Sequence, residues 1–338
     1  MGSRPVRLGA FGAILTALTL LLGACVPRIL PPGPDIATPA LKSEDFVTAD
    51  GLKLPVRSWL PADDKPKAII LALHGMNDYS HAFAMPGPWW ALHGIATFAY
   101  DQRGFGAAPE RGYWPGVDAL VGDMDAMVKL LHARYPGVPV YLLGESMGAA
   151  VVMVGLARPS PPRVAGAILS SPAVWGRDTM DLGKRLALFL AVHTIPWWTV
   201  TGANLHITAS DNVWMLMELS RDPRVIKETR IDAIWGLVNL MDDALAAAPH
   251  LGGVPLLILY GEKDEIIPKE ATRTMIDELP AHPAAPRKLA VYRRGYHLLL
   301  RDLNGGVVWS DILAWIDDPE APLPSGADQG ARAWLDRK

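Results

Sequence analysis

A serine between two glycines is the first feature of the sequence that could carry out chemistry. Residues 144–148 read Gly-Glu-Ser-Met-Gly, after an apolar stretch at 140–143 and before small residues at 149–157. A GxSxG motif between a strand and a helix is typical of a nucleophile elbow, whose strained turn exposes the serine hydroxyl above a sheet edge. Glycines flank such a serine because neighbouring backbone passes too close for a side chain. We therefore predict that Ser146 is a nucleophile for acyl transfer.

A histidine must accept the proton of this serine, and a carboxylate must hold the imidazole in one tautomer. When the nucleophile lies on a sharp turn between a strand and a helix, the catalytic residues are expected along the chain in the order Ser, acid, His. The histidines that follow Ser146 are His193, His206, His250, His282 and His297. We predict His297 as the base, because it directly follows the last predicted strand. The other four lie in a presumed insertion or among Pro and Ala ahead of strands, and are interpreted as surface or core residues.

Three carboxylates compete for the role of the acid. Glu262, Asp264 and Glu265 all follow the predicted strand at 255–260. We predict Asp264, because the turn after this strand would expose its side chain at the carboxyl edge of the sheet. Glu262 and Glu265 stay open as alternatives, with solvated surface charge as their ordinary interpretation.

Two backbone N–H groups are expected to stabilise the negative charge that develops on the ester oxygen. One is the N–H of Met147, the residue after the nucleophile. The other is predicted to be the N–H of Met76, in the loop His-Gly-Met-Asn-Asp at 74–78. His74 begins this loop ahead of both acid and nucleophile, so we interpret it as a loop-fixing residue rather than as a second base.

A mostly parallel sheet would position these residues. Strand-like stretches at 45–49 and 52–60 flank Asp50-Gly51, a strong hairpin signal that predicts an antiparallel start. Apolar runs suited to strands buried on both faces then alternate with longer amphipathic segments; they lie at 68–73, 95–100, 140–143, 164–170, 255–260 and 289–292. The segment 117–135 predicts a crossover helix, with Asp123 and Asp125 on its solvent face. Together these patterns predict an α/β fold with helices on both faces of the sheet.

One connection is too long for a simple crossover. About 80 residues separate Ser170 from the strand at 255–260, where about 30 would suffice. The segment begins with an apolar stretch around Phe189, Trp197 and Trp198, and we predict a helical cap insertion at about 173–235. The hydrolytic domain as a whole is predicted at 44–318. Residues 319–338 are predicted to form a loosely held C-terminal tail.

The N-terminus predicts a lipoprotein signal. Residues 1–24 combine an early cationic pair with an apolar run that is short for a membrane span. The run ends in Leu-Gly-Ala-Cys, which resembles a bacterial lipobox with lipidation at Cys25. An uncleaved anchor or an ordinary cleaved signal are the alternatives. The Pro-rich segment 25–43 predicts a stiff tether, and the protein is expected in the bacterial cell envelope. The Val after Cys25 favours the outer membrane, because by resemblance an Asp there retains such proteins at the inner membrane.

Composition excludes several function classes. The formal charge of −3 and the absence of basic runs argue against nucleic-acid binding. One Cys can form neither an intramolecular disulfide nor a thiolate metal cage. No metal or cofactor motif is present, so we predict no cofactor, and the sequence indicates no particular protein partner.

Five motifs in order identify a family resemblance. They are HGMND at 74–78, DQRGFG at 101–106, GESMG at 144–148, GEKDEIIP at 261–268 and GYH at 295–297. From about residue 44 to 317 the chain resembles the monoacylglycerol lipase and lysophospholipase branch of the α/β-hydrolases, a group also called serine aminopeptidase-like. The resemblance implies the α/β-hydrolase fold, a Ser146, Asp264 and His297 triad, and oxyanion donors at Met76 and Met147. Ala108 and Ala149 depart from the usual Ser and Gly of these motifs.

The resulting functional prediction is a serine hydrolase. It would cleave carboxylic esters, with lipid-like acyl substrates of the monoacylglycerol or lysophospholipid type favoured by the apolar cap and the predicted membrane anchor at Cys25. A peptidase, thioesterase or other acyl hydrolase using the same residues is the alternative. An anchored binding module without catalysis is disfavoured, because it has no need of an intact Ser, acid and His.

Overall fold

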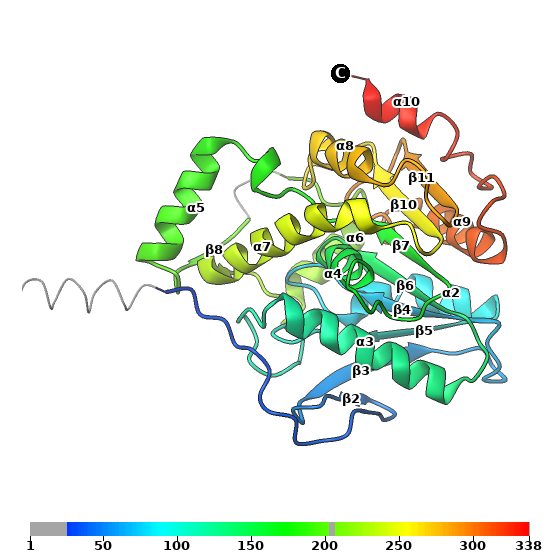
Figure 1. The fold of residues 1–338 in the computed structure, drawn as a ribbon, viewed down its shortest axis with the longest axis horizontal. Helices are drawn as coiled ribbons and strands as arrows, with labels where there is room; N and C mark the ends of the chain where they lie inside the picture. Colours follow the sequence, from blue (N-terminus) through cyan, green and yellow to red (C-terminus); the bar gives the residue numbers. More distant parts are fainter. Residues whose placement is uncertain (1–25, 203–206, 338) are drawn as a thin grey trace, which may run out of the picture.

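A single large sheet organises the molecule. The structure, a computed structural model, describes residues 26–202 and 207–337 (Figure 1). Within this part of the chain the strands lie side by side in the order β1 (Ala40–Leu41), β2 (Asp45–Val47), β3 (Lys53–Trp59), β5 (Ile95–Tyr100), β4 (Ala68–Leu73), β6 (Val140–Glu145), β7 (Gly166–Ser170), β10 (Leu256–Gly261) and β11 (Arg287–Tyr292). Pairs from β1 to β5 are antiparallel, and all pairs from β5 to β11 are parallel. The predicted α/β fold class is confirmed.

The central strands are apolar because both of their faces are covered. Every residue of β4, β5, β6, β7 and β10 is buried. Successive side chains of β4 enter different clusters, since Leu71 joins one core and Ile70 the other. β4 and β5 occupy the residues that the sequence predicts, while β6 runs two residues past its predicted end and therefore includes Glu145.

Helices cover the two faces of the sheet. Those that carry most of the regular connections are α2 (Pro86–Leu92), α3 (Val117–Arg134), α4 (Met147–Leu156), α7 (Ile231–Ala247), α8 (Lys269–Glu278) and α9 (Gly305–Asp317). On one face α3 packs on α4 and α4 packs on α7, while α2 and α9 contact each other on the opposite face (Figure 1). Each face therefore has its own hydrophobic core.

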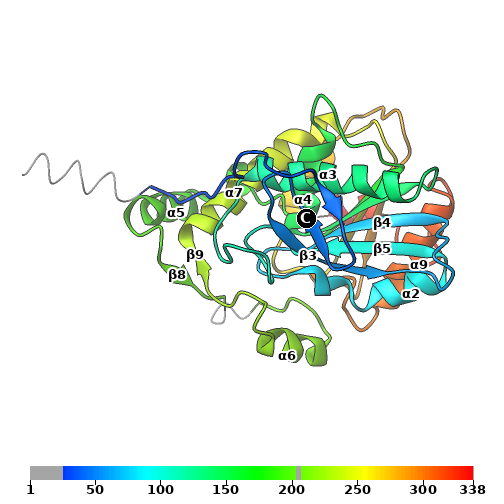
Figure 2. The ribbon, with the colours of Figure 1, turned by 90° about the horizontal axis from the view of Figure 1, so that it is seen from below.

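The long connection between β7 and β10 forms a separate group of elements at one end of the molecule. These are α5 (Leu182–Thr194), α6 (Val213–Arg221) and a short antiparallel pair, β8 (Thr199–Val200) with β9 (Thr229–Arg230) (Figure 2). They stand where the sequence predicts a cap, and α7 then returns the chain to the sheet. No helix within 26–202 and 207–337 combines the length and apolarity needed to cross a bilayer.

The first described residues lie along the domain. The Arg28 N–H donates to Oδ2 of Asp232 at the start of α7, at 3.3 Å. The next residues form a parallel bridge with Trp114, and β1 extends the sheet. Cys25 and the predicted signal at 1–24 lie outside the described residues. The segment predicted as a tether therefore contacts the domain over most of its described length.

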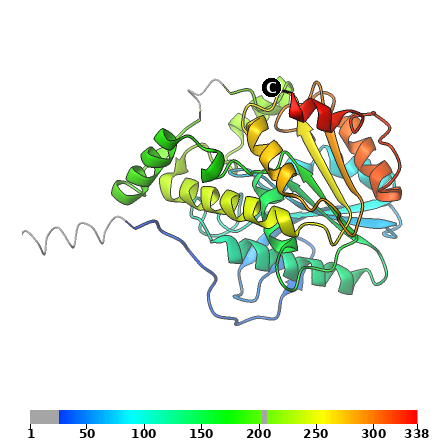
Figure 3. The same ribbon diagram turned by 45° about the horizontal axis from the view of Figure 1, so that its top comes forward.

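The C-terminal segment is packed rather than loosely held, contrary to the sequence-based expectation. It contains α10 (Ala331–Asp336), which contacts α8 and β11 (Figure 3). Leu335 and Leu323 are buried in the two cores, one in each, and Ala331 is buried as well. The apolar residues 331 and 335 are four positions apart, so one face of a short helix can bury both.

The prediction that Asp123 faces solvent is wrong. Its side chain is buried and accepts a 2.6 Å bond from Nε of Arg103. The same guanidinium binds Asp50 of the hairpin turn, also at 2.6 Å, and this bond lowers the pKa of Asp50 well below its usual value. Asp125 instead pairs with Lys129 on the helix surface. The buried arginine thus joins the N-terminal hairpin to α3.

Candidate active site

Ser146 lies in the sharp turn between β6 and α4. Its backbone angles are φ 54° and ψ −112°, a conformation that L-residues rarely adopt. A Cβ on Gly148 would lie 2.1 Å from the carbonyl oxygen of Leu73, and one on Gly144 would lie 2.3 Å from the nitrogen of Ala149. Both distances are far below any contact that atoms tolerate, so the two glycines of the motif are sterically required. The half-buried Ser146 side chain stands at the carboxyl end of the central strand.

The structure brings Asp264 and His297 into direct contact. Asp264 Oδ2 lies 2.9 Å from Nδ1 of His297, and both side chains are almost fully buried. The other carboxylate oxygen of Asp264 accepts the N–H groups of Ile266 at 2.8 Å and Ile267 at 2.9 Å. The carboxylate is thereby fixed, and Nε2 is the imidazole nitrogen left to exchange a proton with a nucleophile.

Ser146 belongs to the same region of the fold, although its hydroxyl donates to no acceptor among the described residues. The link is Glu145, the residue before it, whose carboxylate binds Arg301 at 2.6 Å in the loop that carries His297. Burial raises the pKa of Glu145, and the positive charge of Arg301 opposes that rise. Hydrogen bonds of catalytic groups are often loose in a substrate-free site and tighten when substrate binds.

Two unpaired backbone N–H groups belong to the elbow and to the loop beside it. β4 and β6 are neighbours, with Leu73 opposite Gly144, so the loop after β4 lies beside Ser146. A Cβ on Gly75 would lie 3.4 Å from Cβ of Ser146, which shows how closely this loop approaches. The N–H groups of Met76 and Met147 have no hydrogen-bond partner within the described chain. Both donors are therefore available to an oxyanion.

His74 is committed to holding its loop. Its Nδ1 lies 2.8 Å from the carbonyl oxygen of Gly75, and its Nε2 accepts the N–H of Gln102 at 3.0 Å. Complete burial lowers the pKa of His74. With both ring nitrogens engaged and the ring neutral, this histidine has no free position for proton transfer, as expected of a loop-fixing residue.

The remaining candidates lie elsewhere. Glu262 is exposed, and Glu265 accepts the N–H of Thr208 from the cap connection at 2.7 Å, so neither carboxylate binds His297. The imidazole of His193 packs near Trp235. His250 and His282 are exposed, and His206 lies outside the described residues. Among the described histidines, His297 alone pairs with a carboxylate of the predicted acid loop.

Sequence reasoning missed several polar residues of this region. Arg301 is buried and binds Asp78 as well as Glu145. Asp302 binds both Ser210 of the cap connection, at 2.6 Å, and the N–H of Tyr296, at 2.7 Å. One signal was available: Glu145 places a carboxylate at the end of a strand buried on both faces, and a buried charge requires a partner.

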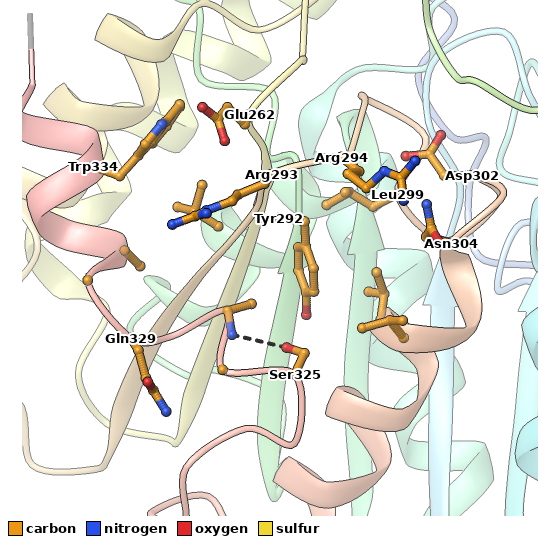
Figure 4. Close-up of a pocket in the computed structure, with 18 of the residues that line it drawn as sticks. Glu262, Tyr292, Arg293, Arg294, Leu299, Asp302, Asn304, Ser325, Gln329 and Trp334 are labelled. Carbon is orange, nitrogen blue, oxygen red and sulfur yellow. Dashed lines mark hydrogen bonds between the residues drawn. The ribbon is translucent and has the colours of Figure 1, made fainter.

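A cavity of about 710 Å³ lies against the loop that carries His297, between β11, α9 and the C-terminal segment (Figure 4). Its walls include Glu262, Arg293, Arg294 and Trp334, but none of Ser146, Asp264 and His297. It is therefore distinct from the candidate site. Within 26–202 and 207–337, no three His, Cys, Asp or Glu side chains are grouped so that they could hold a metal ion.

Comparisons with known proteins agree on the fold and the family. The family model for serine aminopeptidase, S33, matches residues 64–304. Among curated relatives, a monoacylglycerol lipase of Mycolicibacterium smegmatis is 25% identical over 80% of this chain and 95% of its own. Human monoglyceride lipase is 27% identical over 82% of this chain and 90% of its own.

Solved structures give the same architecture. A monoglyceride lipase of Saccharomyces cerevisiae, in complex with a substrate analog, superposes with a TM-score of 0.68 at 20% identity, over 86% of this chain and 98% of that one. A monoacylglycerol lipase of Paleococcus ferrophilus gives 0.64 at 21% identity, over 78% and 98%. At these identities the likeness establishes the fold.

Proposed function

The chain belongs to the serine aminopeptidase S33 family, and from this membership we propose that it is a carboxylic ester hydrolase acting through Ser146, His297 and Asp264. The observation that carries the proposal is the buried 2.9 Å contact between Asp264 and His297, on loops that adjoin a strained serine elbow. Two relatives that align over most of their length are lipases of monoacylglycerols, which supports ester hydrolysis.

Each group has a defined role in the proposed reaction. Ser146 Oγ forms a bond to the acyl carbon while Nε2 of His297 takes its proton. The ester C–O bond then breaks, and the same proton passes to the departing alcohol. Water next attacks the acyl-enzyme, again through His297, and releases the acid. Met76 and Met147 would donate their N–H groups to the oxyanion in both halves of the reaction.

We propose a lipid-like acyl substrate. The cap exposes large apolar side chains that would be costly to leave in water without a use; they include Leu182, Leu186, Phe189, Leu190, Trp197, Trp198, Val213 and Trp214. Phe189 also packs near Trp235, so part of this surface serves the cap itself. The two lipase relatives support the same substrate class.

A peptidase is the second candidate, because the family that matches the chain is described as serine aminopeptidase. A substrate panel separates the two. Purified protein should be assayed with short p-nitrophenyl esters, monoacylglycerols, lysophospholipids and aminoacyl amides, with Ser146→Ala as the blank. Ester turnover with a preference for the lipid esters supports the proposal. Turnover of the amides alone would replace it with the peptidase.

We also propose that Cys25 is lipidated, that residues 1–24 are then removed, and that the protein is held in the cell envelope. The support is the lipobox-like end of the apolar run and its coincidence with the one Cys of the sequence. Expression with labelled palmitate tests this. Label on the wild type but not on Cys25→Ser is expected, whereas an unlabelled, freely soluble mature protein would contradict it.

A further inference from the structure

A buried arginine joins the three loops of the candidate site. Arg301 comes four residues after His297, and its guanidinium is 4% exposed. Nη1 lies 2.7 Å from Oδ2 of Asp78, and Nη2 lies 2.6 Å from Oε1 of Glu145. The three side chains come from positions 78, 145 and 301, so only the folded chain brings them together.

Each partner of Arg301 stands next to a group of the proposed mechanism. Glu145 directly precedes Ser146, and its own carboxylate is 1% exposed. Asp78 comes two residues after Met76, in the loop that supplies one oxyanion donor, and its other oxygen accepts the N–H of Tyr79 at 2.9 Å. The guanidinium therefore connects the loop of the base to the elbow and to the oxyanion loop.

The backbone of Arg301 is held as firmly as its side chain. Its N–H donates to the carbonyl oxygen of Leu298 at 2.8 Å, which closes a turn directly after His297. Its carbonyl oxygen accepts a 2.9 Å bond from the side chain of Asn212, which begins α6 of the cap. Movement of the arginine would therefore also move the turn behind the imidazole.

Stability alone is a poor explanation for this cluster. Removing three charged groups from water costs several kcal/mol for each ion, and well-packed apolar residues of similar size often stabilise a protein as well or better. Burial raises the pKa of Glu145 and works against the charged form of Arg301, but the two carboxylates still raise the pKa of the guanidinium. What an arginine supplies and an apolar residue does not is a planar fork that fixes two acceptors in one geometry.

We propose that Arg301 is a positioning residue, which acts through its bonds to Asp78 and Glu145. These bonds would fix where the N–H donors of Met76 and Met147 lie relative to Ser146 and His297. The inference rests on the proposed function, because it assigns no chemistry to Arg301 itself. Misplacing reacting groups by about 1 Å can cost about a hundredfold in rate, and the loss of one oxyanion donor costs a comparable factor.

The expected effect appears in turnover rather than in binding. Arg301→Met should lower kcat by about ten- to a hundredfold on a short soluble ester, with KM changed by less than about twofold. The rate of labelling of Ser146 by a fluorophosphonate should fall in parallel, because that reaction uses the same nucleophile and donors. Arg301→Lys keeps a cation but loses the planar fork, so its kcat and labelling rate should lie between those of the wild type and of Arg301→Met. Arg293→Met is the matched control, since this exposed arginine lies in the same loop and should leave kcat unchanged.

A neutral triple variant separates positioning from simple charge balance. Arg301→Met leaves two carboxylates buried without a cation, so it will also lower the melting temperature. Combining it with Asp78→Asn and Glu145→Gln removes that cost, and the melting temperature should recover while kcat stays low. Recovery of kcat together with the melting temperature would overturn the inference, as would wild-type kcat in Arg301→Met. If Arg301→Met does not fold, the triple variant and Arg301→Lys decide the question.

The same measurements distinguish this inference from the proposed function. A wild-type protein that is folded but neither labelled at Ser146 nor active on esters would remove the nucleophile, and the positioning role would fall with it. A labelled wild type together with equally fast labelling of the triple variant would overturn the role of Arg301 alone.

Discussion

Asp264 meets Nδ1 of His297 at 2.9 Å while two backbone N–H groups hold its other oxygen, so the carboxylate cannot rotate away from the imidazole. Glu262 and Glu265, its neighbours in the sequence, do not make this contact. The acid of the proposed triad is therefore distinguished by geometry from two residues of the same chemistry.

Asp264→Asn should lower kcat by about a thousand- to ten-thousandfold, because the amide no longer favours the tautomer whose Nε2 accepts a proton. Glu262→Gln is the matched control and should retain wild-type kcat, because its side chain is exposed and away from the imidazole. Steady-state kinetics on a short ester measures both. Equal losses in the two variants would mean that Asp264 is not the acid.

Ser146→Ala and His297→Ala should each reduce kcat by at least about a thousandfold, and the double variant should lose little more. The reason is that a hydroxyl without its base, or a base without its hydroxyl, leaves the same residual rate from the oxyanion donors. Circular dichroism should show that all three variants are folded. Losses that multiply in the double variant would contradict a shared catalytic unit.

Gly148→Ala should prevent folding or destabilise the protein by more than about 4 kcal/mol, since its Cβ would lie 2.1 Å from a backbone oxygen. Gly122→Ala is the matched control within α3. Apart from the adjoining backbone of its own helix, no atom lies within 4 Å of the new Cβ there, and a helical alanine stabilises by about 0.5–1 kcal/mol relative to glycine. Thermal unfolding compares the two. Normal stability of the Gly148 variant would show that the elbow can open.

Asp302→Asn should change the pH dependence of stability. Burial, partly opposed by the bonds from Ser210 and the Tyr296 N–H, raises the pKa of Asp302 from 3.8 to about 6. As pH rises from 4 to 6, the unfolded carboxyl loses its proton while the folded one keeps it. The wild type therefore loses stability over this window, and the asparagine variant does not. Melting temperatures between pH 4 and 7 should shift progressively in favour of the variant, and a constant difference would refute the argument.

The sequence predicts those parts of this fold that local patterns encode. Strands β4 and β5 appear at their predicted residues because burial on both faces leaves an unbroken apolar run. The elbow can also be predicted from the sequence, since close backbone contacts exclude any side chain at its two glycines.

Features that depend on distant partners could not be predicted in this way. Asp123 looks like a surface residue of an amphipathic helix until Arg103 is placed beside it. Arg301 looks like one more charge after the histidine, because Glu145 lies 156 residues earlier in the chain. The Pro-rich composition of 26–39 indicates an extended backbone, but not the surface along which it lies.

The bond between the Arg28 N–H and Asp232 attaches the chain to the domain only a few residues after Cys25. Arg28 lies three positions after Cys25, and three residue steps reach at most about 11 Å. A lipid on Cys25 would therefore hold the enzyme close to the bilayer, by the part of the domain where Arg28 meets the start of α7. A protein attached in this way would reach only substrate close to its point of attachment. The enzyme would then work on substrate in the membrane to which it is attached.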